Sequence, residues 1–150
     1  MASGLTLHVE VVTTTGAVYT GDADEVVAPG GEGQLGILPR HAPLMTTLTI
    51  GALHIKHDGT EDTLFIGGGF MEVSDNRVVI LADEAERATD IDEAKAEQAR
   101  QRAQRDLAAA TSDVDRAALE GQIERALGRI RVTEIQRTRR SRRGELPPQG

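Results

Sequence analysis

The chain has 150 residues and a formal net charge of −7, with 39% hydrophobic and 27% charged residues. These values are typical of a globular protein and allow one ordinary domain or two small ones. The absence of cysteine excludes disulfides, thiolate catalysis and cysteine-ligated zinc. The opening residues lack a charged leader before an apolar segment, and no run of about 18 apolar residues follows. We therefore predict a cytoplasmic protein that reaches a membrane only through a partner.

Charge and glycine are distributed unevenly along the chain. Residues 1–90 contain 14 acidic and 4 basic residues, whereas residues 91–150 contain 10 acidic and 13 basic ones. Twelve of the 16 glycines lie in the first part, and no proline occurs between Pro43 and Pro147. A compositional shift of this kind indicates a domain boundary. We predict one unit over residues 1–88, a second over 89–137, and a disordered basic segment over 138–150.

The first unit is predicted to be all-β. Five short runs, several of them alternating in polarity and separated by Gly, Asp or Asn, cover residues 5–12, 24–29, 44–55, 62–73 and 77–83. Asp58-Gly59 and Asp75-Asn76 are typical of tight hairpin turns, because Gly and Asn tolerate the positive φ that such turns require. The pattern predicts an antiparallel β-sandwich or barrel.

The second unit is predicted to be a hairpin of two helices, over residues 89–110 and 112–137, which makes the fold class α+β. Asp90 and Ser112 each precede an acidic residue by three positions, as in a helix capping box. The expected apolar stripes are Ile91, Ala94, Ala99, Ala103 and Leu107 in the first helix and Leu119, Ile123, Leu127 and Ile130 in the second. Each alanine in place of leucine removes about 2 kcal/mol of burial energy, so we expect a weakly packed hairpin that can detach.

No motif in the chain predicts catalysis. The glycines of residues 67–70 lack the Lys and Ser/Thr of a phosphate-binding loop, which favours a β-bulge or tight turn. His54 and His57 are three residues apart in a predicted strand and so point to opposite faces, which argues against a metal site. No serine lies in a motif that links it to a histidine and an acid. We predict a non-enzymatic protein without a metal site.

The arginine-rich segment raises a second hypothesis. Residues 137–143 contain five arginines, which could neutralise phosphates. A solvated tail is the favoured interpretation, because the overall charge is negative and few aromatic residues are available for base stacking. The alternative function is a free-standing adaptor or nucleic-acid-binding module that uses this tail.

Three segments and the helical hairpin carry a family resemblance. The segments are "GQLGILPRHAPL" (33–44), "GGFMEV" (68–73) and "VVILADEAERATDID" (78–92). Together they resemble the epsilon subunit of the bacterial rotary F-type ATP synthase, over residues 5 to about 135 and in the family's order. The resemblance implies a non-catalytic subunit of the central stalk, whose β-sandwich contacts the gamma subunit and the ring of c subunits at the cytoplasmic face of the membrane.

The resemblance also implies a partner-binding segment. Its residues here are Gln34, Leu35, Gly36, Ile37, Pro39, Arg40 and His41, within a shaped turn over 33–44. Glycine permits close backbone approach, and proline limits the entropy lost on binding. The family commonly reads Gly-Glu-Leu-Gly-Ile and Pro-Gly-His, whereas this chain has Gln34 and Arg40. The charge presented to the c ring is therefore altered.

For the hairpin, the resemblance implies regulation. In the family it extends toward the alpha and beta subunits of the catalytic head and blocks ATP hydrolysis, and some members bind a regulatory ATP on the folded hairpin. The matching positions are Glu86, Ile91, Asp92, Lys95, Ala96, Arg102, Arg125 and Arg129. Lys95 replaces the family's arginine and loses its planar fork, which predicts weaker or altered binding. The alternative is that these charges pair with nearby Glu on exposed helix faces. We expect no cofactor other than this ATP.

Overall fold

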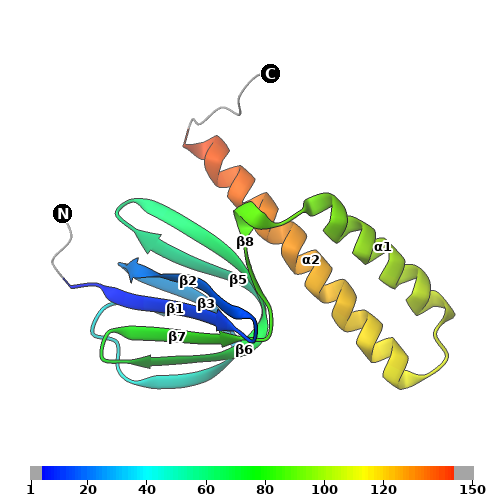
Figure 1. Cartoon of the computed structure of the whole chain (residues 1–150), viewed down its shortest axis with the longest axis horizontal. Coiled ribbons are helices and arrows are strands. Elements are labelled where there is room, and N and C mark those ends of the chain that lie inside the picture. Colours follow the sequence, from blue (N-terminus) through cyan, green and yellow to red (C-terminus); the bar gives the residue numbers. More distant parts are fainter. Residues whose placement is uncertain (1–4, 144–150) are drawn as a thin grey trace. The chain divides into compact units, whose positions relative to one another are not determined.

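A computed structural model describes residues 5–143 of the chain. The chain divides into two compact units between Arg87 and Ala88. The first is built from β-strands and the second from helices (Figure 1). The α+β class and the β-sandwich followed by helices are confirmed.

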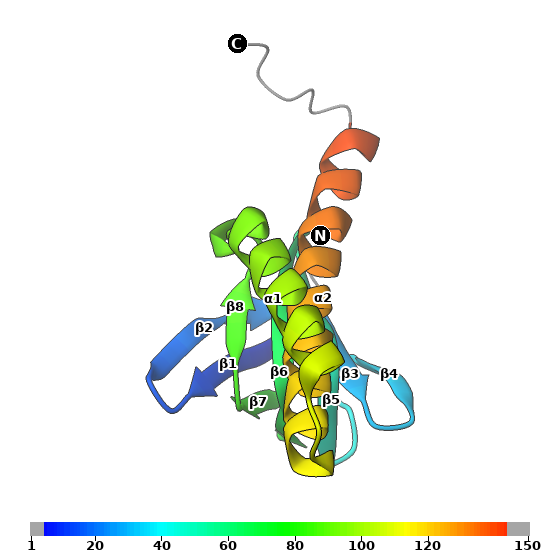
Figure 2. The same ribbon diagram turned by 90° about the vertical axis from the view of Figure 1, so that its right-hand side faces the viewer.

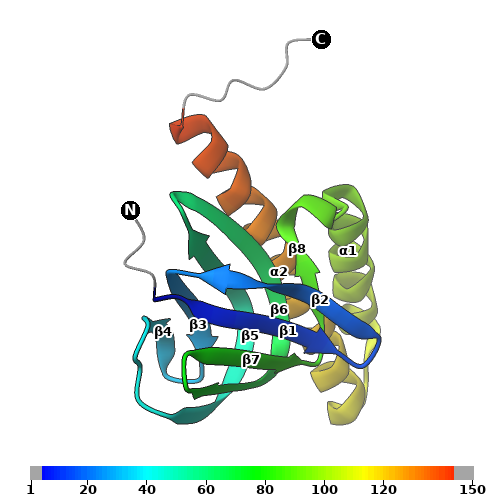
Figure 3. The same cartoon turned by 60° about the vertical axis from the view of Figure 1, so that its left-hand side comes forward.

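Eight strands form the first unit as one sheet that folds over on itself (Figure 3). They are β1 (Leu7–Thr13), β2 (Gly16–Ala23), β3 (Glu25–Gly30), β4 (Gly33–Ile37), β5 (Leu44–His57), β6 (Thr60–Ser74), β7 (Arg77–Ala82) and β8 (Ala85–Arg87). The sheet order is β2-β1-β7-β6-β5-β3-β4, and β8 also pairs with β6. All pairs are antiparallel except β1–β7, which is parallel.

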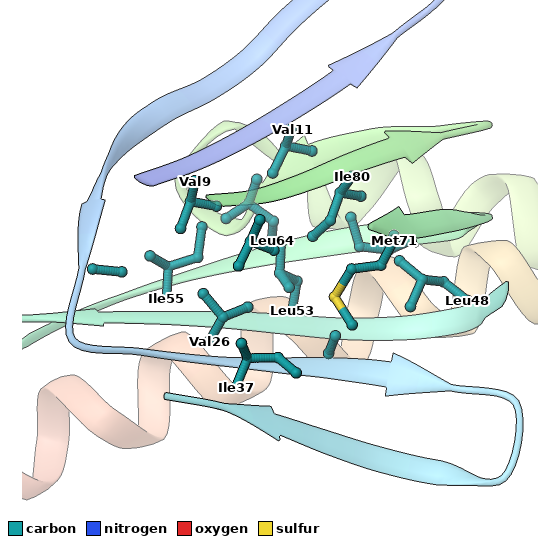
Figure 4. Packing of buried hydrophobic residues seen from close by; sticks show 14 of the residues in the cluster. Val9, Val11, Val26, Ile37, Leu48, Leu53, Ile55, Leu64, Met71 and Ile80 are labelled. Atoms are coloured by element: carbon teal, nitrogen blue, oxygen red, sulfur yellow. The ribbon is translucent and has the colours of Figure 1, made fainter. Parts of the chain in front are cut away.

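The core lies between the folded layers of this sheet. Alternate residues of β1, β5, β6 and β7 point inward, and Figure 4 shows them meeting from several strands. Fully buried members include Val9, Leu53, Leu64 and Ile80. All residues of the cluster and those packed against it come from positions 7–85. The first unit therefore has its own core, which is what an independently folding domain requires.

The glycines at 67–69 let β6 change partners. Residues 69–74 pair with β7, whereas residues 64–66 pair with β8. Gly68 and Gly69 have φ of 96° and 139°, and a Cβ on Gly69 would lie 2.2 Å from the Leu81 carbonyl oxygen. The predicted bulge or tight turn is therefore confirmed as an irregularity within the strand.

Several local predictions can be compared directly with the structure. Asp58, Asp75 and Asn76 adopt positive φ of 48°, 49° and 59°, which confirms both hairpin turns. The sequence predicts a turn over residues 33–37, but these residues form β4, because Ile37 is buried opposite Val26 of β3. The five predicted runs also left out β2 and β8.

The second unit contains a short 3-10 helix, η1 (Ala88–Asp90), and two α-helices, α1 (Glu93–Ala109) and α2 (Asp113–Arg142). The helices lie side by side (Figure 2), because only three residues connect them. Ser112 caps α2 as predicted, since its hydroxyl accepts a 3.1 Å hydrogen bond from the Asp115 N–H. The prediction for Asp90 is wrong: Asp92 caps α1, and Asp90 belongs to η1.

Two further expectations for the hairpin are corrected. The buried residues of α1 and α2 are Ala96, Ala103, Ala126 and Val132, whereas Ala94, Ala99 and Leu127 of the expected stripes are exposed. The segment predicted to be disordered from 138 continues α2 to Arg142, because arginine is a good helix former and cations favour a helix C-terminus. Positions 144–150 lie outside the described residues. Among the helices of residues 5–143, none combines the length and the apolar composition that a membrane-spanning segment needs.

Candidate partner-binding site

The seven predicted partner-binding residues divide between a strand and a loop. Gln34, Leu35, Gly36 and Ile37 belong to β4, the last strand in the sheet order, which pairs with β3 alone. Ile37 is fully buried, so its side chain holds β4 in the core and presents nothing to a partner. Gln34 and Gly36 are exposed and Leu35 is half-buried.

The remaining residues, Pro39, Arg40 and His41, lie in a loop over 38–43 that we call the β4–β5 loop. Arg40 has a φ of 67°, the left-handed region that side chains rarely adopt. Its backbone N–H donates a 2.6 Å hydrogen bond to Oδ1 of Asn76, in the turn between β6 and β7. The His41 N–H donates to the Leu38 carbonyl at 3.2 Å. The loop is thereby fixed in place while the Arg40 side chain remains exposed.

A group of exposed apolar side chains lies on the outer face of β5, β6 and β7. Met45, Phe70 and Leu81 are 72%, 56% and 56% exposed. Phe70 is directly opposite Leu81 across the β6–β7 pair, and Met45 of β5 lies diagonally from Phe70. We call these three residues the outer apolar patch. Contiguous exposed apolar surface on a small protein is typical of a binding site.

The sequence prediction missed the outer apolar patch. It could have been found by following the period-2 alternation through the predicted strands, because Phe70 shares the outward face of β6 with Glu72 and Leu81 shares that of β7 with Arg77. The strand predictions identify the inward, core-forming positions, but they do not identify which outward positions carry apolar side chains.

The eight predicted nucleotide-binding residues are placed in different parts of the chain. Glu86 belongs to β8 in the first unit, and the others belong to the second unit. The Asp92 carboxylate accepts a hydrogen bond from the Lys95 N–H as the α1 cap, and Ala96 is buried. Ile91 is half-buried, and Lys95 and Arg102 are exposed.

Two of the α2 arginines share a half-buried face of the helix. Arg125 and Arg129 are four residues apart, and the Arg125 guanidinium lies over Gly121, where a Cβ would be 3.4 Å from its Nη1. The Arg125 guanidinium thus packs against the backbone of its own helix at Gly121.

Other charged groups of the hairpin are paired. Arg100 donates hydrogen bonds to Glu97, which lower the pKa of the Glu97 carboxyl and raise that of Arg100. Arg137 near the end of α2 pairs with Glu93 at the start of α1. The ends of the two helices are thus joined by an exposed ion pair.

Family models match nearly the whole described chain. The "ATP synthase, Delta/Epsilon chain, beta-sandwich domain" matches residues 6–88, and the "ATP synthase, Delta/Epsilon chain, long alpha-helix domain" matches 89–134. The chain is 47% identical over 130 residues to an ATP synthase epsilon chain of Acidithiobacillus ferridurans, covering 87% of this chain and 92% of that one. It is 46% identical over 126 residues to that of Nitratidesulfovibrio vulgaris, covering 84% and 94%.

Solved structures support the same fold. A chain of the Euglena gracilis mitochondrial ATP synthase (OSCP, F1 and c-ring) superposes with a TM-score of 0.72 at 23% identity, covering 83% of this chain and 79% of that chain. A chain of the Tetrahymena thermophila mitochondrial ATP synthase central stalk and c-ring gives a TM-score of 0.56 at 14% identity, covering 85% and 96%.

Proposed function

Because the chain belongs to the ATP synthase epsilon-chain family, a family of non-catalytic central-stalk subunits, we propose that its sandwich binds the rotor and its hairpin inhibits ATP hydrolysis. The observation that carries the proposal is the outer apolar patch together with the β4–β5 loop. This loop is held by hydrogen bonds and carries the exposed Arg40. The complex would hold the chain as a peripheral subunit at the cytoplasmic face of the membrane.

The outer apolar patch is assigned to the gamma subunit. Interface energy concentrates in a few large apolar or aromatic side chains that become fully desolvated. Phe70 is one of only two phenylalanines in a chain without tryptophan, and it is more than half exposed beside Leu81. An apolar surface of this kind suits a long-lived contact within the rotor.

The β4–β5 loop is assigned to the c ring. Backbone strain at a non-glycine residue persists where the surrounding structure enforces it, and such sites are frequently functional. Arg40 makes no ion pair within residues 5–143, and its guanidinium belongs to an exposed residue. The guanidinium is suited to a carboxylate or a backbone carbonyl on the partner.

This assignment is tested by charge substitutions on the patch. Phe70→Glu and Leu81→Glu should each weaken binding to purified gamma subunit by at least about 30-fold, as expected for loss of a hot-spot residue worth about 2 kcal/mol. Thr20→Glu is the matched control, because Thr20 is an exposed strand residue of β2, outside the patch. Equal binding by all three variants would show that the patch is not the gamma contact.

The hairpin is assigned to inhibition because its packing is thin. Ala96 and Ala103 are the buried residues of α1, and each buries little surface. A helix held by so few apolar atoms can exchange between two conformations separated by a few kcal/mol. Exposed cations such as Arg102 and Arg105 are available to meet acidic surfaces of the catalytic head.

A regulatory ATP is proposed at the hairpin, with Lys95, Arg102, Arg125 and Arg129 as the cations that meet the phosphates. The support is the exposed position of Lys95 and the shared face of Arg125 and Arg129. Calorimetry of the full-length chain with millimolar ATP should give measurable heat, and Lys95→Arg should strengthen binding because it restores the planar fork. Absence of heat from both proteins would remove this site.

A further inference from the structure

A histidine and two aspartates meet where β5 turns into β6. His57 ends β5, Asp58 follows it in the turn, and Asp24 lies between β2 and β3. Ligand atoms from the three residues all lie within 4.8 Å of one another. Within residues 5–143, no other group of His, Cys, Asp or Glu side chains meets that criterion.

Backbone hydrogen bonds hold the three residues together. The Asp24 N–H donates to the Lys56 carbonyl at 2.7 Å, and the Asp58 N–H donates to Asp24 Oδ2 at 2.9 Å. The Thr60 hydroxyl donates to the His57 carbonyl at 2.6 Å. The two aspartates thus reach the same histidine from separate connections, and the hydrogen bond from the Asp58 N–H orients the Asp24 carboxylate.

In the imidazole of His57, one ring nitrogen has a polar partner at hydrogen-bond distance and the other does not. Nε2 lies 3.2 Å from Asp58 Oδ2, and this carboxylate favours a proton on Nε2. The Nδ1 atom itself is buried and has no hydrogen-bond partner among residues 5–143, although the His57 side chain as a whole is 40% exposed. It faces Asp24 Oδ2 at 4.0 Å, which is too long for a hydrogen bond. A buried lone pair beside a carboxylate is unfavourable unless a proton or a metal ion lies between them.

We propose that His57 Nδ1 and the Asp24 carboxylate bind a divalent transition-metal ion of the zinc class, with Asp58 positioning the ring from Nε2. Bonds of about 2.0–2.2 Å from the ion to each ligand atom span the 4.0 Å gap after a small inward movement. Imidazole and carboxylate together suit zinc-class ions, whereas Mg²⁺ prefers oxygen ligands alone. A carboxylate on the second ring nitrogen is the usual way such a histidine is oriented.

His8 provides an internal control of similar composition. Its Nδ1 lies 3.2 Å from Asp22 Oδ1 and its Nε2 lies 3.3 Å from Glu10 Oε1. Both nitrogens therefore already have a carboxylate at close range, and no gap is left for an ion. His54 likewise has Glu61 Oε1 3.1 Å from its Nδ1.

The test is a Zn²⁺ titration of the full-length chain. The imidazole nitrogen signals of its four histidines are monitored by NMR at each Zn²⁺ concentration. His57 should respond at the lowest Zn²⁺ concentration, through Nδ1, and Mg²⁺ should leave it unchanged. Asp24→Asn and Asp58→Asn should each weaken the response about 10-fold or more. Asp22→Asn should leave it unaltered.

Three results would overturn the proposal. One is a His57 response no stronger than that of His8. Another is an unchanged response in both Asp24→Asn and Asp58→Asn, each first shown to keep the native spectrum. The third is a His57 ring that carries protons on both nitrogens at neutral pH and ignores Zn²⁺, because a proton would then fill the gap.

Discussion

Arg40 offers a direct test of the strain in the β4–β5 loop. The left-handed conformation costs a residue with a side chain about 1–2 kcal/mol, and Arg40 adopts it with a φ of 67°. Glycine removes that cost but loses about 0.5–1 kcal/mol more backbone entropy on folding. Arg40→Gly should therefore raise the free energy of unfolding by about 0.5–1 kcal/mol. At about 4–8 °C per kcal/mol, the melting temperature should rise by about 2–8 °C.

Thermal and urea unfolding, followed by circular dichroism, measure this effect. Arg40→Ala is the matched control, because alanine keeps the strained φ and the backbone hydrogen bond to Asn76. We expect Arg40→Ala to be close to wild type in stability. If Arg40→Gly were no more stable than Arg40→Ala, the strain argument would be refuted. Both variants should bind the c ring more weakly, since both lose the guanidinium.

Three further predictions concern the fold. Gly69→Ala should destabilise the sandwich by more than about 2 kcal/mol in urea unfolding, because its Cβ would meet the Leu81 carbonyl at 2.2 Å; a near-neutral result would contradict the strand irregularity. Tyr19 is the only tyrosine and tryptophan is absent, so absorbance at alkaline pH reads its ionisation alone. Burial raises the pKa of Tyr19 above 10.0, and Arg87 opposes this shift, so Arg87→Gln should raise the pKa further. Because the folded pKa is the higher one, the associated stability should decline as the pH rises through it, and an unshifted pKa would argue against the burial. Ser112→Ala should cost about 0.5–2 kcal/mol of helix stability by circular dichroism, and no loss would exclude the cap.

Composition and strand periodicity were sufficient to predict the two-unit architecture, since the change in charge and glycine content coincides with the change from strands to helices. The predictions failed where tertiary pairing overrides local pattern. Residues 33–37 are rich in glycine and resemble a turn, yet Ile37 pairs with Val26 and makes a strand. Asp90 and Asp92 are both good caps, and local sequence does not decide between them.

The candidate site was less predictable than the fold, because its parts are distant in sequence. The outer apolar patch requires the register of β5, β6 and β7, which places Leu81 opposite Phe70. The search for metal ligands compared His54 with His57, which are close in sequence. Local spacing does not predict that Asp24 lies beside His57, because the pairing of β3 with β5 brings the two together.

The most direct test of the proposed function is ATP hydrolysis by an ATP synthase catalytic core that lacks its own epsilon chain. The core is titrated either with the full-length chain or with a chain that ends at Ala88, which retains the whole sandwich core. We predict that both forms bind the core through gamma and that only the full-length chain suppresses hydrolysis. Equal suppression by both forms, or failure of both to bind, would contradict the assignment of the sandwich to the rotor and of the hairpin to inhibition.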